Sequence, residues 1–297
     1  MPRLTQVLLA LAILAGSRPG KAQGWRAVDQ ALGRPGAIQP GDVYKVGFPR
    51  TDLHVSVRGV TVKPTLALGS WIAFKQIGDS QAALMGDLVL TEAEVEPVMS
   101  KLQESGIEQT AVHNHLLHES PHVLYMHIMG RGRLATLAAA VHAALALTGT
   151  PLGAPAAAPA TPLGLDTGMI ARTLGFPGKV AGGVYQVGVP RLDTIQVEGM
   201  VVPPAMGVAT AINFQSTGGG KAAITGDFVL IGSEVNPVLR ALRSSGIEVT
   251  ALHSHMLAEA PRLFFMHFWA NADALKLAQG LRAALDKVNV KKPALDE

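Results

Sequence analysis

The chain has no cysteine among its 297 residues. It therefore has no disulfide and no thiolate ligand, so the fold rests on its core and any metal must be bound by His, Asp or Glu. Aromatic residues make up 5% of the chain, and no run of Lys and Arg with interleaved aromatics suggests a phosphate-backbone groove. Glycine patterns of the Rossmann and P-loop types are missing too. We expect no nucleic-acid partner.

No apolar run in the sequence is long enough to span a bilayer comfortably. The run Val7–Ala15 follows the basic Arg3 and precedes small residues around Ala22, which is typical of a secretory signal peptide. We predict a signal peptide over residues 1–22, a periplasmic or secreted location, and no stable membrane anchor after cleavage. Without the three basic residues of this segment, 22 basic residues face 22 acidic ones, so the mature chain is formally neutral.

Most of the remaining chain consists of two copies of one sequence. Several stretches recur in the same order, as VYKVGFPR at 43–50 does in VYQVGVPR at 184–191. The stretch between the copies is rich in Pro, Ala and Gly and has no charge, which is typical of a tether. The 48% apolar content and the length suit two cores. We predict two repeats that pack together: domain 1 at 25–147, a linker at 148–164 and domain 2 at 165–290.

Each repeat combines strand patterns with helix patterns. Apolar runs such as AALMGDLVL at 82–90 predict strands. A capping box of Thr91 with Glu94 predicts the start of a helix that ends at Gly106, and an Ala and Leu rich segment at 134–147 predicts the last helix. The order of strands, helix, hairpin and helix predicts an α+β fold: two tandem copies of a domain with an antiparallel sheet and helices packed on one face.

The histidines concentrate in two stretches that share the constellation His-x-His-x3-Glu-x7-His. These are His113, His115, Glu119 and His127 in the first copy, and His253, His255, Glu259 and His267 in the second. If each stretch is a β-hairpin with its turn near Glu119, His113 lies opposite His127 and His115 points to the same face. Three converging imidazoles suit a divalent metal with an open position. The spacing predicts one metal site in each repeat, with zinc expected first and copper or nickel as alternatives.

Glu119 and Glu259 are predicted as a fourth ligand or a general base, as in a metal-dependent hydrolase of unknown small-molecule substrate. Two other hypotheses stay open. The histidine clusters can be structural, or bind a small ligand or partner, in a non-catalytic envelope module. In a third hypothesis the second copy is the functional one and the first is a scaffold, because His118, His122 and Tyr125 change the surroundings of the first site. Whether the protein is an enzyme stays open as well.

Two further repeated pairs carry charge. Asp87 and Asp227 follow a glycine at the end of a strand-like run, where a turn is favoured over a role in orienting a histidine. Arg50 and Arg191 are predicted to form local ion pairs, with Asp52 and Asp193 respectively, rather than to bind an anionic ligand.

The shared segments VYxVGxPR, GDxVL, EVxPVxxxLxxSGIE and HxHxLxExP followed by MH resemble the LppY/LpqO family of exported bacterial proteins. The resemblance covers essentially the whole mature chain. It implies export and domain identity, and it transfers no reaction, because the family's function is unknown. Without cysteine this chain cannot carry the lipid anchor of the lipoprotein members, so a soluble form is expected. His-x-His-x3-Glu also resembles the first cupin metal motif, but helices interrupt the short strands that a jelly roll needs.

Overall fold

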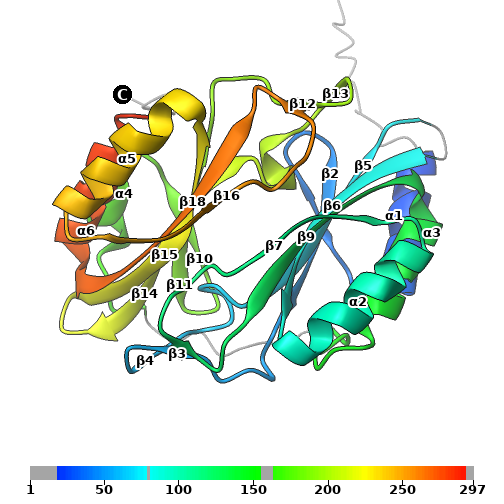
Figure 1. Cartoon of the computed structure of the whole chain (residues 1–297), viewed down its shortest axis with the longest axis horizontal. Helices are drawn as coiled ribbons and strands as arrows, with labels where there is room; N and C mark the ends of the chain where they lie inside the picture. The colour runs from blue at the N-terminus through cyan, green and yellow to red at the C-terminus, as the bar shows by residue number, and fades with distance from the viewer. Residues whose placement is uncertain (1–18, 79–80, 155–162, 292–297) are drawn as a thin grey trace, which may run out of the picture.

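The computed structural model describes residues 19–78, 81–154 and 163–291. The predicted signal peptide lies outside these residues except for positions 19–22, which belong to the first helix. The molecule consists of two similar halves side by side, each with a large sheet whose helices lie on the outer side (Figure 1). Within the described ranges, no helix combines the length and apolarity needed to cross a membrane.

The first repeat begins with a helix, and its two other helices follow the sixth and the ninth strand. Its elements are α1 (Pro19–Leu32), β1 (Ala37–Gln39), β2 (Val43–Pro49), β3 (Ser56–Val57), β4 (Val60–Thr61), β5 (Gly69–Gln76), β6 (Gln81–Leu90), α2 (Glu92–Glu104), β7 (Glu108–His113), β8 (Glu119–Ser120), β9 (Leu124–Arg133) and α3 (Leu134–Leu145).

The second repeat has the same order of elements and one added 3-10 turn. Its elements are α4 (Thr167–Leu174), β10 (Gly178–Ala181), β11 (Val184–Pro190), β12 (Gln196–Val197), β13 (Met200–Val201), the 3-10 turn η1 (Pro204–Met206), β14 (Ala209–Gly218), β15 (Lys221–Ile231), α5 (Gly232–Ser244), β16 (Glu248–His253), β17 (Glu259–Ala260), β18 (Leu263–Asp273) and α6 (Ala274–Leu285).

The two large sheets have equivalent strand orders, β1-β2-β5-β6-β9-β7 and β10-β11-β14-β15-β18-β16. All neighbouring strands in them run antiparallel. The α+β fold of two tandem copies, predicted from the sequence, is confirmed. The predicted capping box also forms in part, because the Glu94 carboxylate accepts a hydrogen bond from the Thr91 amide at 2.8 Å.

The two faces of each sheet contact different parts of the molecule, because successive side chains along a strand point to opposite faces. On β2, Tyr44, Val46 and Phe48 pack with the helices in the core of the first repeat. Lys45 and Gly47 lie on the other face, which is turned toward the second repeat and lines a cavity between the halves. Any site shared by the two repeats therefore lies between the inner faces of the two sheets.

Each repeat also sends an arm across to its neighbour. Arm 1, residues 51–68, contributes Val57 and Leu66 to a buried cluster with Val184 and Trp269 of the second repeat. Arm 2, residues 192–208, contributes Val197 and Met206 to an equivalent cluster with Val43 and Met85 of the first repeat. Burial of apolar side chains at these contacts stabilises the packing of one half against the other.

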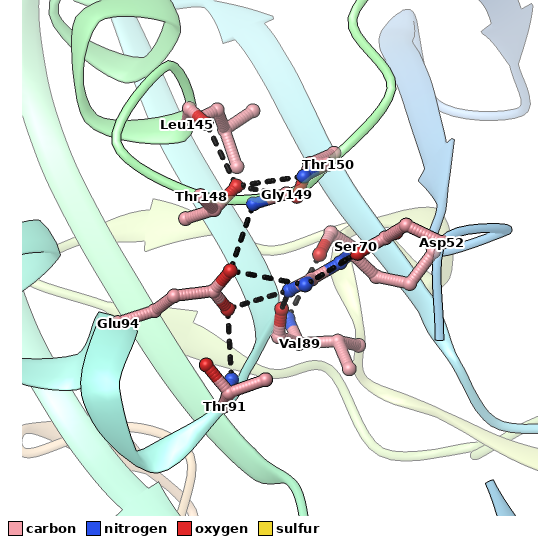
Figure 2. Close-up of polar contacts among 10 residues, drawn as sticks. Asp52, Ser70, Val89, Thr91, Glu94, Leu145, Thr148, Gly149 and Thr150 are labelled. Atoms are coloured by element: carbon pink, nitrogen blue, oxygen red, sulfur yellow. Dashed lines mark hydrogen bonds and ion pairs between the residues drawn. The ribbon is translucent and has the colours of Figure 1, made fainter. Parts of the chain in front are cut away.

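A buried arginine fixes the start of arm 1. Arg50 follows β2 and donates hydrogen bonds to the Val89 carbonyl at 2.6 Å, to Glu94 at 2.8 Å and to Asp52 at 2.8 Å. Figure 2 shows Glu94 also facing Thr91 and the Gly149 amide, which donates to it at 2.8 Å. The predicted ion pair with Asp52 is present, and Glu94 is a second partner that ties strand, helix and linker together.

Candidate metal centre

The six predicted histidines meet at the interface between the two repeats. Three pairs of rings stack across it, with centroid separations of 3.6 Å for His113 and His253, 3.7 Å for His115 and His267, and 3.6 Å for His127 and His255. Reciprocal hydrogen bonds hold the two loops in place, because Thr110 donates to the His255 carbonyl at 2.6 Å and Thr250 donates to the His115 carbonyl at 2.5 Å. The two predicted sites therefore lie side by side in one cluster.

The predicted hairpin register is wrong by two residues. His113 lies opposite Tyr125, and His127 lies opposite Ala111. A bulge between Gln109 and Ala111 shifts the pairing of β7 with β9, and the second repeat has the same irregularity. The segment after β7 leaves the sheet, which lets His115 approach the centre from beyond the end of the strand.

An aspartate on the neighbouring strand lies directly beside the last histidine of each set. Asp87 pairs with His127 and Asp227 pairs with His267. The predicted turn at these aspartates is wrong, because β6 and β15 run through them to Leu90 and Ile231. In each repeat the aspartate and two histidines form a set, called here an Asp-His-His triad: triad 1 is Asp87, His115 and His127, and triad 2 is Asp227, His255 and His267.

The separations within the triads suit a single ion. Carboxylate oxygen to Nε2 distances are 3.9 Å from Asp87 to both His115 and His127, and 3.4 Å and 3.9 Å from Asp227 to His255 and His267. Ligands about 2.0–2.1 Å from a tetrahedral zinc ion are about 3.3–3.4 Å apart. The donor atoms are a few tenths of an ångström wider than this, which small side-chain rotations close.

Two other combinations draw ligands from both repeats. One is His113, His127, His253 and His255, and the other is His113, His115 and His267, with all ligand atoms of each group within 4.8 Å of one another. His113 and His253 lie between the triads and belong to neither. They are therefore the side chains that can bring both triads into one centre.

The cluster leaves an unusual number of polar atoms without a partner. In the described part of the chain, thirteen buried side-chain nitrogen and oxygen atoms have no hydrogen-bond partner, and ten of them belong to the six histidines and two aspartates. Buried polar groups in folded proteins are nearly always paired with protein, ordered water or a bound ion, so a concentration of this kind marks a candidate binding site. Imidazole nitrogens and carboxylate oxygens are the ligands that zinc prefers when thiolates are absent, so the residues fit a metal ion.

The electrostatics agree with that fit. Burial lowers the pKa of His113 to about 4 and that of His267 to about 3, so the imidazoles stay neutral and keep a free lone pair. Burial also raises the pKa of Asp87 to about 8 and raises the pKa of Asp227 well above its ordinary value. A cation bound between these groups would offset the cost of burying two carboxylates.

One hydrogen bond sets the orientation of His267. Its Nδ1 lies 2.8 Å from the Gly226 carbonyl oxygen, which can only accept, so Nδ1 carries the proton. Nε2 then presents its lone pair to the cluster. His127 has the matching hydrogen bond with the Gly86 backbone. Backbone carbonyls commonly orient metal-binding histidines in this way.

We expect the metal-free protein to lose stability as the pH falls from about 6.5 toward about 4. The unfolded chain protonates its histidines in this range while the folded chain keeps them neutral, so the unfolded state binds more protons. The raised pKa of Asp87 acts in the opposite direction, but six imidazoles outnumber two aspartates. Thermal unfolding of chelator-treated protein followed by circular dichroism measures the effect.

The control for this pH dependence is the double variant His113→Gln, His253→Gln, which should depend less on pH. A midpoint that is the same at about pH 5 and about pH 6.5 in the unmodified chain would mean that its imidazoles are not held neutral by folding.

The structure does not bring Glu119 and Glu259 into the cluster. Glu119 accepts a hydrogen bond from the Val123 amide at 3.2 Å, and Glu259 accepts from the Leu263 amide at 2.9 Å and from Arg262 at 3.2 Å. Neither belongs to a group of residues whose ligand atoms converge. Their role as fourth ligand or general base stays a prediction.

Sequence reasoning undervalued the two aspartates. The available signal was a single acidic residue within the apolar runs MGDLVL and TGDFVL, kept in both copies. A charge in a buried strand requires a partner, so an aspartate within an apolar run favours a role beside the histidines over a turn.

The fold and the site together define the class of protein: an α+β protein of two repeats that share a cluster of His and Asp residues. The chain belongs to the family described as Domain of Unknown Function (DUF1259), whose model matches residues 26–147 and 168–287. No curated protein matches the chain.

Among solved structures, the trimeric bacterial microcompartment shell protein PduB is similar, with 15% identity and a TM-score of 0.23 over 86% of this chain and 95% of that one. EtuB from Clostridium kluyveri has 9% identity and a TM-score of 0.20 over 84% and 90%. Similarity at these TM-scores carries no conclusion about this chain.

Proposed function

We propose that this chain is an exported metal-binding protein in which both repeats build one centre with two metal positions, one in each Asp-His-His triad. The observation that carries the proposal is the convergence of ten unpartnered buried nitrogen and oxygen atoms from six histidines and two aspartates. Zinc is the expected ion because the ligands are nitrogen and oxygen atoms only, and copper or nickel are the alternatives.

The chemistry that such a centre supports best is metal-dependent hydrolysis. Two histidines and a carboxylate around zinc leave a position for water, and bound zinc lowers the pKa of that water to about 7. Both triads line a cavity of about 650 Å³, so a substrate has access to them. In this proposal the histidines stay neutral and hold the ion, and the aspartates supply negative charge and fix its position.

Export rests on the sequence of residues 1–22 and on the resemblance to the LppY/LpqO family. Cleavage near Ala22 would leave Trp25, Val28 and Leu32 in place, and these described α1 side chains belong to the core of the first repeat. The mature protein would then begin just before the first repeat.

Metal content tests the proposal directly. We expect untagged protein recovered from the periplasm of a bacterial host to contain about two metal ions per chain, and the double variant His127→Ala, His267→Ala, which removes one histidine from each triad, to lose most of them. The matched control is His118→Ala with His122→Ala, because these side chains are 56% and 49% exposed and lie outside the cluster. Elemental analysis by plasma mass spectrometry gives the content.

Clearly substoichiometric metal in the unmodified chain, or full metal in the His127 and His267 variant, would contradict the proposal. Recovery of the protein only from the cytoplasmic fraction would contradict export while leaving the metal question open to the same measurement.

A non-catalytic interaction module is the second candidate. The ring pairs stacked across the interface at 3.6–3.7 Å favour it, because they join the repeats without any ion. In that case the protein recovered from the periplasm carries no metal, and the His113→Ala, His253→Ala variant is less stable than the unmodified chain.

A further inference from the structure

The cluster lies at one side of the cavity between the two sheets. Both triads line this cavity, whereas His113 and His253 are not among its lining residues. A ligand in the cavity therefore meets the aspartates and the outer histidines first. A volume of about 650 Å³ is in the range of sites for small organic molecules.

The two walls of the cavity differ in the size of one side chain next to the triads. A row of directly paired residues crosses each sheet: Gly47, Trp71, Asp87 and His127 in the first repeat, and Gly188, Ala211, Asp227 and His267 in the second. Where the first repeat has an indole, the second therefore has a methyl group.

This difference decides which side of the cavity is wide. The Trp71 ring crosses to the second repeat, where its Cη2 lies 2.8 Å from the place that a Cβ on Gly207 would take. On the opposite wall, Ala211 has no such ring. The glycines beside these two positions do not differ, because a Cβ on Gly47 or on Gly188 would meet no atom within 4 Å. The Asp227 side chain is also more exposed than that of Asp87, 15% against 8%. The wide side therefore leads to triad 2.

Two lysines give the cavity a positive charge. Lys45 lies over the Trp71 ring, with its Nζ 3.8 Å from the ring centroid, and donates to the Ala205 carbonyl at 3.2 Å. Lys179, on β10, pairs with Gln186, the equivalent of Lys45 in the second repeat, and also lines the cavity. Of the described lining residues, the two triad aspartates are the only acidic ones.

The two ammonium groups also affect each other. Burial and the positive charge of Lys179 lower the pKa of Lys45 to about 8, against the opposite effect of Asp87. Two like charges facing one cavity are unfavourable unless an anion lies near them, so the pair marks a place for a negatively charged group.

We propose that the cavity binds a small anionic molecule with a carboxylate or phosphate group. It enters on the wide side, over Gly188 and Ala211, and its charged group lies beside Lys45 and Lys179. From there another part of the molecule reaches the metal held by triad 2. This inference rests on the metal-binding function proposed above, and it makes the second repeat the one that receives the ligand while Trp71 narrows the first.

Calorimetric titration of the metal-loaded full-length protein tests the entry side. The probes are inorganic phosphate and acetate as anions, and imidazole as a neutral metal ligand. We expect Ala211→Trp to weaken phosphate and imidazole binding at least about tenfold at unchanged metal content, because the indole would fill the approach to triad 2. The matched control is Leu192→Trp, which adds an indole at a side chain that is exposed and does not line the cavity, and it should leave both affinities close to those of the unmodified chain. Gly188→Leu fills the same space if Ala211→Trp fails to fold.

The anion subsite has its own variant. We expect Lys45→Met with Lys179→Met to weaken phosphate or acetate binding at least about tenfold and to leave imidazole binding unchanged, since only the anions need the ammonium groups. The stronger of the two anions identifies phosphate or carboxylate as the recognised group.

The outcomes separate the two proposals. Absence of metal from the unmodified protein means that the proposed function has failed. Full metal content with no anion binding, or with anion binding that ignores the lysine substitutions, overturns the anion subsite. Full metal content with phosphate and imidazole binding unaffected by Ala211→Trp and by Gly188→Leu overturns the entry side.

Discussion

The double substitution Asp87→Asn, Asp227→Asn is expected to remove nearly all bound metal although all six histidines remain. In each triad the two carboxylate oxygens lie 3.4–3.9 Å from the Nε2 atoms of the two histidines, one oxygen beside each. An amide keeps the shape of this ligand but loses its negative charge and binds a divalent cation poorly. We expect each metal position to lose affinity by at least about 100-fold, the upper end of what removing a supporting residue costs.

The single variants make the test sharper. If each triad holds one ion, Asp87→Asn lowers the content from two ions per chain to one, and Asp227→Asn does the same. If instead one ion is held across the repeats by His113, His127, His253 and His255, neither aspartate is a ligand and the content stays unchanged. Metal analysis with competition by a chelator distinguishes the two arrangements.

The matched control is Glu119→Gln with Glu259→Gln. A glutamine oxygen still accepts from the Val123 and Leu263 amides, so the loops are expected to keep their shape and the protein its metal. Loss of metal in this variant would restore the two glutamates to the ligand set that the sequence predicts.

The sequence was sufficient for the fold because its signals are local and repeated. The capping box at Thr91 and Glu94, the apolar runs and the duplicated segments each predict an element from neighbouring residues alone, and the structure confirms the α+β fold that they compose. The spacing of the histidines also singled out the six that meet at the interface, but not the sets in which ligand atoms converge, because these include Asp87 and Asp227.

The arrangement of the centre depends on features that spacing does not contain. A bulge between Gln109 and Ala111 shifts the pairing of β7 with β9 by one residue, and no residue type in that stretch predicts it. The stacking of His113 on His253 depends on how the repeats pack, which in turn depends on the arms at 51–68 and 192–208. The sequence shows two copies of a pattern and cannot show that the copies face each other.

The second large effect concerns the residues that hold those arms. Arg50→Met is expected to lower the free energy of unfolding by about 3–5 kcal/mol, the usual cost of leaving one partner of a buried ion pair alone. The Arg50 side chain is 1% exposed, and its removal leaves the carboxylates of Glu94 and Asp52 without their cation and the Val89 carbonyl without its donor. Urea unfolding measures the change.

Two comparisons show whether that cost comes from the buried pair. Adding Glu94→Gln to Arg50→Met should cost less than the sum of the two single changes, because the unpaired carboxylate is then gone. Lys101→Met breaks a pair with Glu104 whose side chains are 40% and 65% exposed, and it should cost less than about 1 kcal/mol. Equal losses in Lys101→Met and Arg50→Met would contradict the role given to the buried arginine. Because arm 1 begins directly after Arg50 and lines the cavity at Pro64–Ala67, a selective loss of stability in Arg50→Met should also weaken anion binding before the fold is lost.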